Sequence, residues 1–362
     1  MTAPGRGAGA AGGTRLADLT TFRVGGPAER LVTATTTDEL VDAVREVDDA
    51  DEPLLVVAGG SNLLVTDEPV PGTVVRIATR GVTVESADAC GGVSVRVAAG
   101  EVWDDLVARA VTEGWVGVEA LSGVPGSVGA TPVQNVGAYG QEVAQTIASV
   151  RVWDRYGQQV VTVPHADCRF TYRHSAFKGT DRYVVLDVLF QLRLGELSAP
   201  VGYADLARGL GVDVGARVPL VEAREAVLAQ RRRRGMVLDA DDPDTWSAGS
   251  FFTNPILSPS RFEALRERVR AVLGADVEPP TYPADEGVKT SAAWLIERAG
   301  FTKGHGLPGP AALSTKHTLA LTNRGGASAA DLLALAREVR DGVRERFGVT
   351  LVNEPVLVGL SL

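Results

Sequence analysis

The stretch that decides the fold is EALSGVPGSVGATPVQNVGAYGQE, residues 119–142, with five glycines, two prolines and charged residues only at its ends. An ordinary helix is excluded, because Gly and Pro inside a helix cost about 1 and 3 kcal/mol relative to Ala. A solvated linker is excluded too, since Val124, Val128, Val133 and Val136 are apolar. The pattern predicts a tightly folded loop whose glycines let backbone N–H groups approach a ligand, and we interpret it as the floor of a cofactor site.

The glycine spacing in this loop differs from that of the two familiar phosphate loops. Residues 125–140 lack the Lys-Ser/Thr ending of a P-loop and the strand-to-helix context of a dinucleotide fingerprint. A second glycine turn, GGSN at 59–62, follows the β-branched run at 54–58. Alone, such a sequence is more often just a turn. Together, two glycine loops without lysine indicate a large diphosphate ligand held mainly by backbone groups.

Length and charge narrow the class of protein. A chain of 362 residues exceeds what one hydrophobic core usually fills, so two or three domains are expected. The net charge of −9 argues against a nucleic-acid partner, and no apolar run reaches the roughly 18 residues of a membrane span. Residues 1–14 lack an apolar h-region and predict a disordered tail. Cys90 and Cys168 have no metal-type spacing and the four histidines are scattered, which predicts a cytoplasmic protein without a metal site. No obligate protein partner is implied.

Strand and helix patterns alternate irregularly along the chain, which predicts an α+β protein. The expected helices are 37–48, 102–113, 219–234 with Gly235 ending it, 260–274, 290–300 and 327–348. The expected strands are 54–58, 73–78, 93–100, 149–154, 158–163, 182–194, 319–323 and 350–360. Three regions result, with expected bounds at 15–80, 81–235 and 236–350.

Four ordered motifs resemble the UDP-N-acetylenolpyruvoylglucosamine reductase (MurB) family. They are residues 59–64, the loop 125–140, TYRHSAFK at 171–178 and AGSFFTNP at 248–255, and the resemblance extends from about Leu16 to the C-terminus. It implies a non-covalent FAD and NADPH as co-substrate. NADPH would deliver hydride to the flavin, leave, and be replaced by UDP-N-acetyl-3-O-(1-carboxyvinyl)glucosamine, whose reduction gives UDP-N-acetylmuramate for peptidoglycan.

The resemblance also implies the architecture and the flavin contacts. Residues 15–80 and 81–235 would be two FAD-binding subdomains of the vanillyl-alcohol-oxidase (PCMH) type, and 236–350 a smaller α+β substrate-binding domain. Residues 351–362 would be a C-terminal strand that carries the active-site glutamate. The implied flavin contacts are Gly59, Gly60, Ser61, Asn62, Leu63, Gly123, Pro125, Gly126, Gly129, Ala130, Asn135, Gly137 and Tyr139.

Three residues are implied to be catalytic. Hydride transfer to an enolpyruvyl double bond leaves negative charge beside a carboxylate, so the site needs cationic groups there and a proton donor. The resemblance assigns proton donation to Ser250, which alone would be read as a turn serine. It assigns binding of the enolpyruvyl carboxylate to Arg173, because a guanidinium fork suits a carboxylate. Without the resemblance, Arg173 would be read as a surface or loop-bridging arginine. Glu354, by default an exposed strand residue, would support the enol, and we expect burial to raise its pKa.

Five residues are implied to contact the nucleotide sugar. Tyr203, in VGYADL, matches a tyrosine loop of one family branch, where the ring closes over the substrate. Arg234 stands where the family often has Lys near the diphosphate, although a cationic helix end is also favoured by the helix dipole alone. His317, in STKHTLAL, aligns with a sugar contact, while a lone histidine before a strand is more often structural. The remaining two are Tyr172 and Asn254.

One departure keeps other functions open. Many members have Val-Arg after the active-site glutamate, whereas this chain has Pro355 and Val356, which puts one FAD contact in doubt. The alternatives are a non-catalytic nucleotide-sugar sensor that has lost its flavin and a flavin oxidase on the same scaffold. Covalent histidyl attachment is disfavoured because no histidine precedes His165. The sequence leaves NADPH versus NADH and the oligomeric state open.

Overall fold

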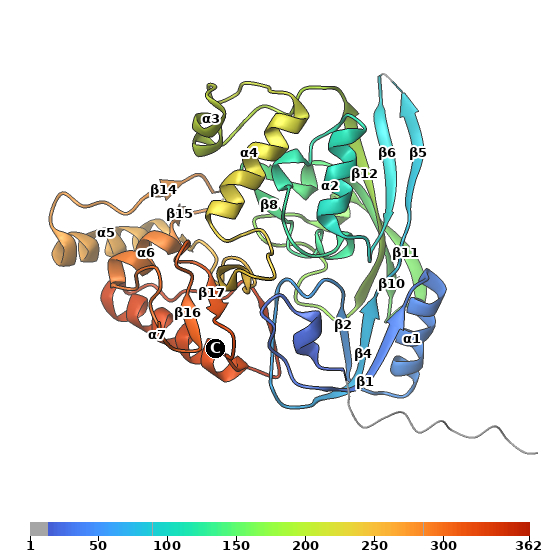
Figure 1. Ribbon diagram of the computed structural model, residues 1–362, viewed down its shortest axis with the longest axis horizontal. Helices are drawn as coiled ribbons and strands as arrows, with labels where there is room; N and C mark the ends of the chain where they lie inside the picture. The colour runs from blue at the N-terminus through green and yellow to red at the C-terminus, as the bar shows by residue number, and fades with distance from the viewer. Residues whose placement is uncertain (1–13, 89, 285) are drawn as a thin grey trace, which may run out of the picture.

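The computed structural model describes residues 14–362 except 89 and 285, so the expected tail at 1–14 lies almost wholly outside the described residues. The fold is α+β, as the sequence predicts. Figure 1 shows a larger body built from the blue to yellow part of the chain and a smaller orange and red lobe beside it. Each has its own core: one cluster packs around Trp103 and Phe190, and the other around Phe251, Phe252 and Phe347.

A small parallel sheet begins the body. Its strands are β1 (Ala28–Ala34), β4 (Val70–Ile77) and β2 (Leu54–Val57), in the order β1-β4-β2. Helix α1 (Thr37–Asp49) begins at a capping box, in which Thr36 accepts from the backbone of Glu39 and the Glu39 side chain accepts from the backbone of Thr36. Its buried face, which includes Leu40 and Val44, packs into the main core of the body. Periodicity and cap therefore place this helix within one residue of its expected bounds.

A larger antiparallel sheet follows, with the order β11-β10-β12-β6-β5 and β7 paired to β12. Helix α2 (Trp103–Thr112) packs against it and helix α4 (Leu220–Arg233) lies beyond α2, in agreement with Figure 1. A short helix, α3 (Ala204–Leu210), was missed by the sequence patterns. The strands are β5 (Val82–Asp88), β6 (Gly92–Ala98), β7 (Trp115–Val116), β10 (Ile147–Asp154), β11 (Gln159–Pro164) and β12 (Tyr183–Leu194).

The smaller lobe is a helical layer with short strands. Its helices are α5 (Pro259–Leu273), α6 (Ala292–Ala299) and α7 (Ala329–Phe347). Its strands are β13 (Ile256–Leu257), β14 (Thr281–Tyr282), β15 (Val288–Thr290), β16 (Ala311–Leu313) and β17 (Leu321–Asn323). Helix α7 buries a stripe that includes Leu332, Val339 and Phe347 against α5 and α6. Among the residues described, no helix is long and apolar enough to span a membrane.

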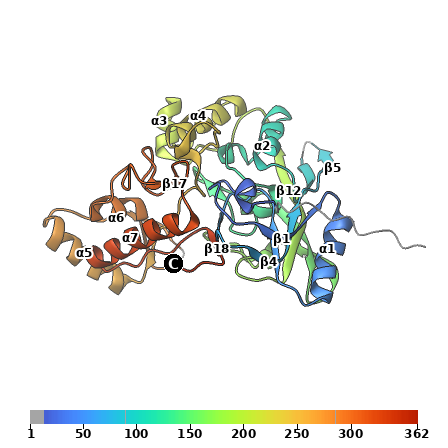
Figure 2. The same ribbon diagram turned by 60° about the horizontal axis from the view of Figure 1, so that its bottom comes forward.

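The last strand differs from its sequence-based expectation. Strand β18 covers only Val356–Val358, and Glu354 precedes it instead of lying within it. Pro355 lacks a backbone N–H, so it cannot donate to a strand ladder. β18 pairs in parallel with β3 (Leu63–Val65), which directly follows the GGSN turn, and Figure 2 shows it at the junction of body and lobe. The end of the chain is thereby brought back to the first glycine loop.

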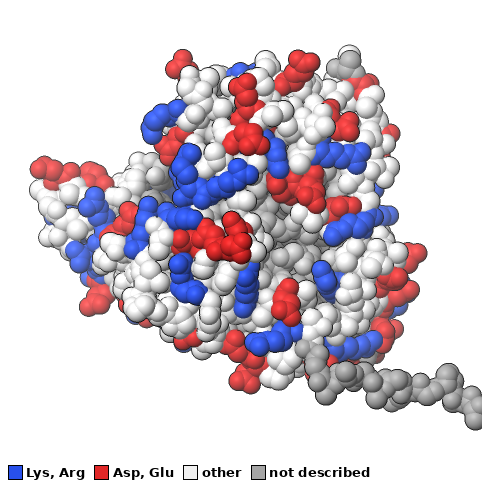
Figure 3. All heavy atoms as spheres, in the orientation of Figure 1, with Lys and Arg blue, Asp and Glu red and all other residues white. Residues whose placement is uncertain are grey.

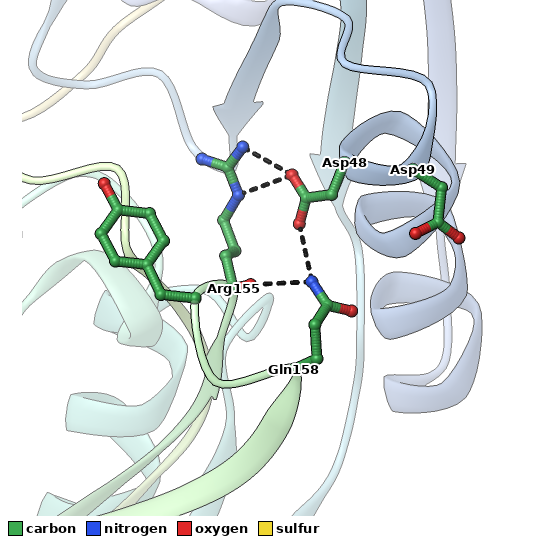
Figure 4. Close-up of a pocket in the computed structure, with 5 residues that line it drawn as sticks. Asp48, Asp49, Arg155 and Gln158 are labelled. Carbon is green, nitrogen blue, oxygen red and sulfur yellow. Dashed lines mark hydrogen bonds and ion pairs between the residues drawn. The ribbon is translucent and has the colours of Figure 1, made fainter.

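A cavity of about 310 Å³ opens on the body where the end of α1 meets the β10–β11 hairpin. Arg155 donates to Asp48 through Nε at 3.0 Å and through a terminal nitrogen at 2.6 Å, and Gln158 bonds to the same carboxylate at 3.4 Å (Figure 4). The Arg155 and Asp48 side chains are 15% and 14% exposed. Neither glycine loop lines this cavity, so we interpret it as a structural joint between the two sheets.

Candidate active site

Two segments that are far apart in the sequence are joined by their backbones at the boundary between body and lobe. The N–H of Glu354 donates to the carbonyl of Phe251 at 2.8 Å, and the N–H of Thr253 donates to that of Val352 at 3.0 Å. Phe251 and Phe252 are completely buried, which anchors the strand-like pairing in the core of the lobe. Ser250 comes directly before this pair, in a turn where Gly249 has a φ of +70°. The pairing therefore carries Ser250 and Glu354 to one edge of the lobe.

Arg173 lies in a tight turn in which Thr171 and His174 exchange backbone hydrogen bonds. Its φ of +53° is unusual for a residue other than glycine and costs roughly 1–3 kcal/mol unless the surroundings hold it. The guanidinium donates to the carbonyls of Gly137 at 2.9 Å and Asn135 at 3.4 Å. Within the described part of the chain, its buried Nε makes no hydrogen bond of good geometry. Arg173 is therefore held in a strained backbone conformation, and its Nε–H has no hydrogen-bond acceptor among the described residues.

Arg173 and Glu354, both implied by the sequence to be catalytic, meet in the structure. Nε of Arg173 lies 3.1 Å from Oε1 of Glu354, and the side chains are 22% and 20% exposed. Because that Nε lacks hydrogen-bond geometry, we treat the contact as an ion pair. Burial raises the pKa of the Glu354 carboxyl, against the lowering effects of the charges on Arg173 and Lys178. The expected direction of the Glu354 pKa is confirmed.

The backbone carbonyl of Glu354 accepts hydrogen bonds from both predicted glycine loops. It accepts from Nδ2 of Asn62 at 3.3 Å and from Nε2 of Gln134 at 3.2 Å. The next donor, the N–H of Val356, bonds to the carbonyl of Asn62 at 2.9 Å. Position 356, where the family often has arginine, thus adjoins the first loop, although the valine side chain is half exposed. The loops, Glu354 and the Ser250 segment form one hydrogen-bonded unit.

The glycine loops form a cradle that fits a close-lying cofactor. A Cβ on Gly59 would lie 2.6 Å from Cα of Gly126, and a Cβ on Gly126 would lie 2.5 Å from Oγ of Ser61. Gly126 also has a φ of +115°, which L side chains rarely adopt. Ser127 is 4% exposed, and its Oγ has no hydrogen-bond partner among the described residues. Bare backbone and an unsatisfied buried hydroxyl are what a polar, flat ligand such as FAD requires of its binding loop.

Tyr203 and Arg234 lie at one end of this cradle. The rings of Tyr203 and Tyr139, a predicted flavin contact, meet edge to face with centroids 5.6 Å apart. Tyr203 is 40% exposed and directly precedes α3. Arg234, at the C-terminal end of α4, forms an ion pair of 3.3 Å with Asp205 of α3. Tyr203, expected to close over the substrate, and Arg234, expected to contact the diphosphate, are therefore both held next to α3.

Against the effect of burial, Asn254 lies close enough to Tyr172 to lower the pKa of the phenol, and it also has a structural role. The Asn254 side chain accepts from the first N–H of α6, that of Ala292, at 3.0 Å. The Tyr172 ring lies under Nζ of Lys289 at 4.6 Å and under the guanidinium of Arg173 at 5.3 Å. Burial raises the pKa of the Tyr172 phenol. The face of the Tyr172 ring thus attracts two cations, Lys289 and Arg173, and Arg173 is the one paired with Glu354.

His317 faces cations. Burial, followed by the charges of Arg234 and Lys303, lowers the pKa of His317 to about 4. The imidazole is therefore neutral at physiological pH, and the cations beside it suit an anionic ligand. Figure 3 shows Lys and Arg side chains gathered where α4 ends in Figure 1. Arg234 and Lys303 therefore bring positive charge close to His317.

The neutral state of His317 gives a testable pH dependence. We expect its imidazole C2–H resonance, identified by its loss in His317→Gln, to stay in the neutral position down to about pH 5. The unfolded chain, with a pKa near 6.5, binds the proton first, so stability falls as the pH drops from 6.5 towards 4. The contribution lost by about pH 5 is roughly 2 kcal/mol. A midpoint above about pH 6 would contradict the buried, cation-flanked placement.

Sequence reasoning missed several polar residues that the structure places at the site. Gln134 and Lys178 lie inside the motifs PVQN and SAFK, so their positions were a signal that went unused. Ser127 lies inside the same glycine-rich loop, whereas Lys289 and Lys303 carry no such signal, because their proximity to the site depends on long-range packing. The missed residues are Ser127, Gln134, Lys178, Lys289 and Lys303.

Comparisons with known proteins identify the family of the chain and its two domains. Residues 241–358 match the family model of the UDP-N-acetylenolpyruvoylglucosamine reductase C-terminal domain, and residues 28–162 match that of an FAD binding domain. The chain is 61% identical over 350 residues to a UDP-N-acetylenolpyruvoylglucosamine reductase of Streptomyces coelicolor, covering 96% of this chain and 90% of that protein. The corresponding enzyme of Thermobifida fusca is 59% identical, with 96% and 97% covered.

A solved structure also resembles the whole fold. The crystal structure of UDP-N-acetylenolpyruvylglucosamine reductase (MurB) from Thermus caldophilus superposes with a TM-score of 0.63 at 27% identity. The alignment covers 95% of this chain and 97% of that one. The likeness therefore includes the body, the lobe and the junction between them.

Proposed function

The chain belongs to the UDP-N-acetylenolpyruvoylglucosamine reductase family, and we propose that its site reduces the enolpyruvyl group of UDP-N-acetyl-3-O-(1-carboxyvinyl)glucosamine with FAD and NADPH. The product is UDP-N-acetylmuramate, a precursor of peptidoglycan. One observation supports this site most directly: the Arg173–Glu354 ion pair is tied through Glu354 to the Ser250 segment and to both glycine loops. A guanidinium, a proton donor and a flavin cradle thereby share one unit.

The loops around Gly59 and Gly126 would hold the FAD, with the buried Ser127 hydroxyl available to it. When bound, FAD supplies hydride taken from NADPH. The remaining predicted contacts, from Leu63 to Tyr139, lie on these same two loops or beside them, and we propose that they line the cofactor. Purified protein should show flavin absorbance. Absence of flavin bands even after FAD is added would favour the nucleotide-sugar sensor.

Hydride addition to the methylene carbon of the enolpyruvyl group leaves negative charge on the neighbouring carbon, next to the carboxylate. Arg173 would neutralise that charge, because its guanidinium is buried enough for the interaction to be strong. The Ser250 hydroxyl would then donate its proton to that carbon, and solvent would reprotonate the serine. Glu354 keeps Arg173 in place and, with a raised pKa, exchanges a proton with the enol more readily than an exposed carboxylate.

We assign the nucleotide end of the substrate to Tyr203, Arg234, Asn254 and His317, with Tyr172 between this end and the reacting group. Residues 15–80 and 81–235 would form the flavin-binding subdomains and 236–350 the substrate-binding domain, with 351–362 returning to the first. Both cysteines are free, Cys90 exposed and Cys168 buried, as in reducing compartments, and we propose a cytoplasmic location.

The assignment of the diphosphate corner predicts a change in substrate affinity. We expect Arg234→Ala to raise the Michaelis constant for the nucleotide sugar about 10- to 100-fold, since a charge-assisted bond is worth roughly 1.5–3 kcal/mol. Tyr203→Phe should raise it by a smaller factor. FAD content should stay normal in both variants. Asp205→Asn is the matched control, because it breaks the Arg234–Asp205 pair but retains the arginine. Colourless Arg234→Ala protein with unchanged substrate affinity would refute the assignment.

A further inference from the structure

Lys178 is not one of the proposed catalytic residues, but its side chain makes hydrogen bonds to groups that hold Arg173 and Glu354 in place. Its ammonium Nζ donates to the backbone carbonyl of Arg173 at 2.9 Å and to Oε1 of Gln134 at 3.0 Å. The same Gln134 amide donates through Nε2 to the carbonyl of Glu354 at 3.2 Å. One ammonium thus reaches the Arg173 backbone directly and the Glu354 backbone through a single side chain.

The local fold aims the Lys178 side chain back at the Arg173 turn. The Ser175 hydroxyl, completely buried, donates to the carbonyl of Val133 at 2.8 Å, and the N–H of Lys178 donates to the carbonyl of Ser175 at 3.3 Å. These bonds fix the segment between Arg173 and Lys178 as a compact hairpin-like loop. A long side chain at 178 is then the right length to return to residue 173.

The Arg173 backbone needs such a partner. Its φ of +53° is favourable only when the surroundings over-determine it. Asn135 holds the turn from one side by donating to the carbonyl of Thr171 at 3.1 Å. Lys178 holds the other side at the carbonyl of Arg173 itself. Without it, the peptide after Arg173 keeps the bond from the N–H of His174 to the carbonyl of Thr171 but loses the partner of its own carbonyl, and we expect the guanidinium to shift from its place beside Glu354.

We propose that Lys178 is a positioning residue for the substrate-reduction step, holding Arg173 and, through Gln134, Glu354 in the geometry in which they meet. This inference rests on the proposed function of the site. Among the described residues, the charged groups that act on the Glu354 carboxyl are Arg173 and Lys178, and the Tyr172 phenol lies close enough to respond to its charge. Lys178 therefore also contributes one of the two positive charges that favour the ionised carboxylate. Gln134 contributes only geometry.

The test compares Lys178→Met with Gln134→Met in rapid-mixing experiments on the FAD-loaded enzyme. Both substitutions keep an unbranched side chain, one atom shorter than lysine and equal in length to glutamine, and remove the polar contact, but only the first removes a charge. Reoxidation of the NADPH-reduced enzyme at saturating enolpyruvyl nucleotide should slow about 10- to 100-fold in Lys178→Met, the cost of a misplacement near 1 Å. Reduction by NADPH, FAD content and the substrate dissociation constant should each stay within about threefold, because Lys178 is assigned to neither ligand.

Three further readouts separate positioning from general stability. The double variant should be less impaired than the product of the two single effects, since both residues act on the Glu354 carbonyl. The limb of the pH profile set by Glu354 should move to higher pH in Lys178→Met and stay in place in Gln134→Met. Lys178→Arg should recover part of the rate by restoring charge and donors. If Lys178→Met does not fold, Gln134→Met and Lys178→Arg still test the relay.

Other results would overturn the proposal. Weaker substrate binding with an unchanged rate would make Lys178 a direct substrate ligand. An unchanged rate, or fully multiplicative effects in the double variant, would remove the relay. Wild-type enzyme that NADPH reduces but the enolpyruvyl nucleotide does not reoxidise would instead refute the proposed function, so the two failures are distinguishable.

Discussion

Ser250→Ala should slow reoxidation of the reduced enzyme by the enolpyruvyl nucleotide about 10²- to 10⁴-fold, the loss expected when a positioned acid is removed. Flavin reduction by NADPH should proceed at close to the normal rate, because that half-reaction needs no proton donor at the substrate carbon. Substrate binding should change little, since Arg173 and Glu354 stay paired. Anaerobic rapid mixing, with each half-reaction followed by flavin absorbance, measures both rates in one preparation.

Two variants control this prediction. Ser250→Cys should recover part of the rate, because a thiol donates a proton from a similar position. Ser247→Ala lies in the same turn, where the Ser247 hydroxyl accepts from the N–H of Gly249 at 3.2 Å. It should cost about 0.5–1.5 kcal/mol of stability with a far smaller effect on reoxidation. Reoxidation of Ser250→Ala at the wild-type rate would show that Ser250 is a turn residue ahead of Phe251 and not the acid.

Gly126→Val should yield protein without FAD. A Cβ at this position already meets Oγ of Ser61 at 2.5 Å, and the branched side chain would fill the space between the two glycine loops. The φ of +115° adds backbone strain to this crowding. The flavin absorbance of the purified protein and a titration with added FAD measure the effect. The N–H of Trp103 bonds to the carbonyl of Gly126 at 3.0 Å, so α2 also resists any shift of the loop.

The matched control for this change is Gly215→Val. Gly215 has a φ of +94°, and a Cβ there meets nothing within 4 Å, so the variant has comparable backbone strain without crowding. We expect Gly215→Val to keep its FAD and lose only stability, roughly 1–3 kcal/mol. Full FAD occupancy in Gly126→Val would exclude the 119–142 stretch from the cofactor site. Equal FAD loss in both variants would attribute it to strain and not to the cradle.

Much of the fold was readable from the sequence because its causes are local. Apolar periodicity and a capping box define α1, and Pro219 and Gly235 flank α4 within one residue of its expected ends. The stretch 119–142 was recognisable as a loop because its Gly and Pro residues disfavour a long helix, and the structure gives it only three-residue 3-10 turns and two-residue strands. Its role in binding a ligand stays a prediction. Motif resemblance then named Arg173, Ser250 and Glu354, of which the structure joins Arg173 to Glu354 and brings Ser250 to the same edge by backbone pairing.

Only the tertiary structure shows how the residues of the site meet, because their meeting depends on contacts between distant parts of the chain. The Glu354 carbonyl is held by Asn62, 292 residues away, and this contact accompanies the β18–β3 pairing that follows the glutamate. The expectation that Glu354 lies inside the last strand was wrong, because Pro355 has no N–H to donate and the strand begins only after it, a local signal that the alternating apolar pattern outweighed. The left-handed Arg173 and the Lys178–Gln134 relay are set by hydrogen bonds across loops. Local propensity selects helices and turns, whereas the meeting of these loops follows from burying two cores side by side and satisfying the backbone groups between them.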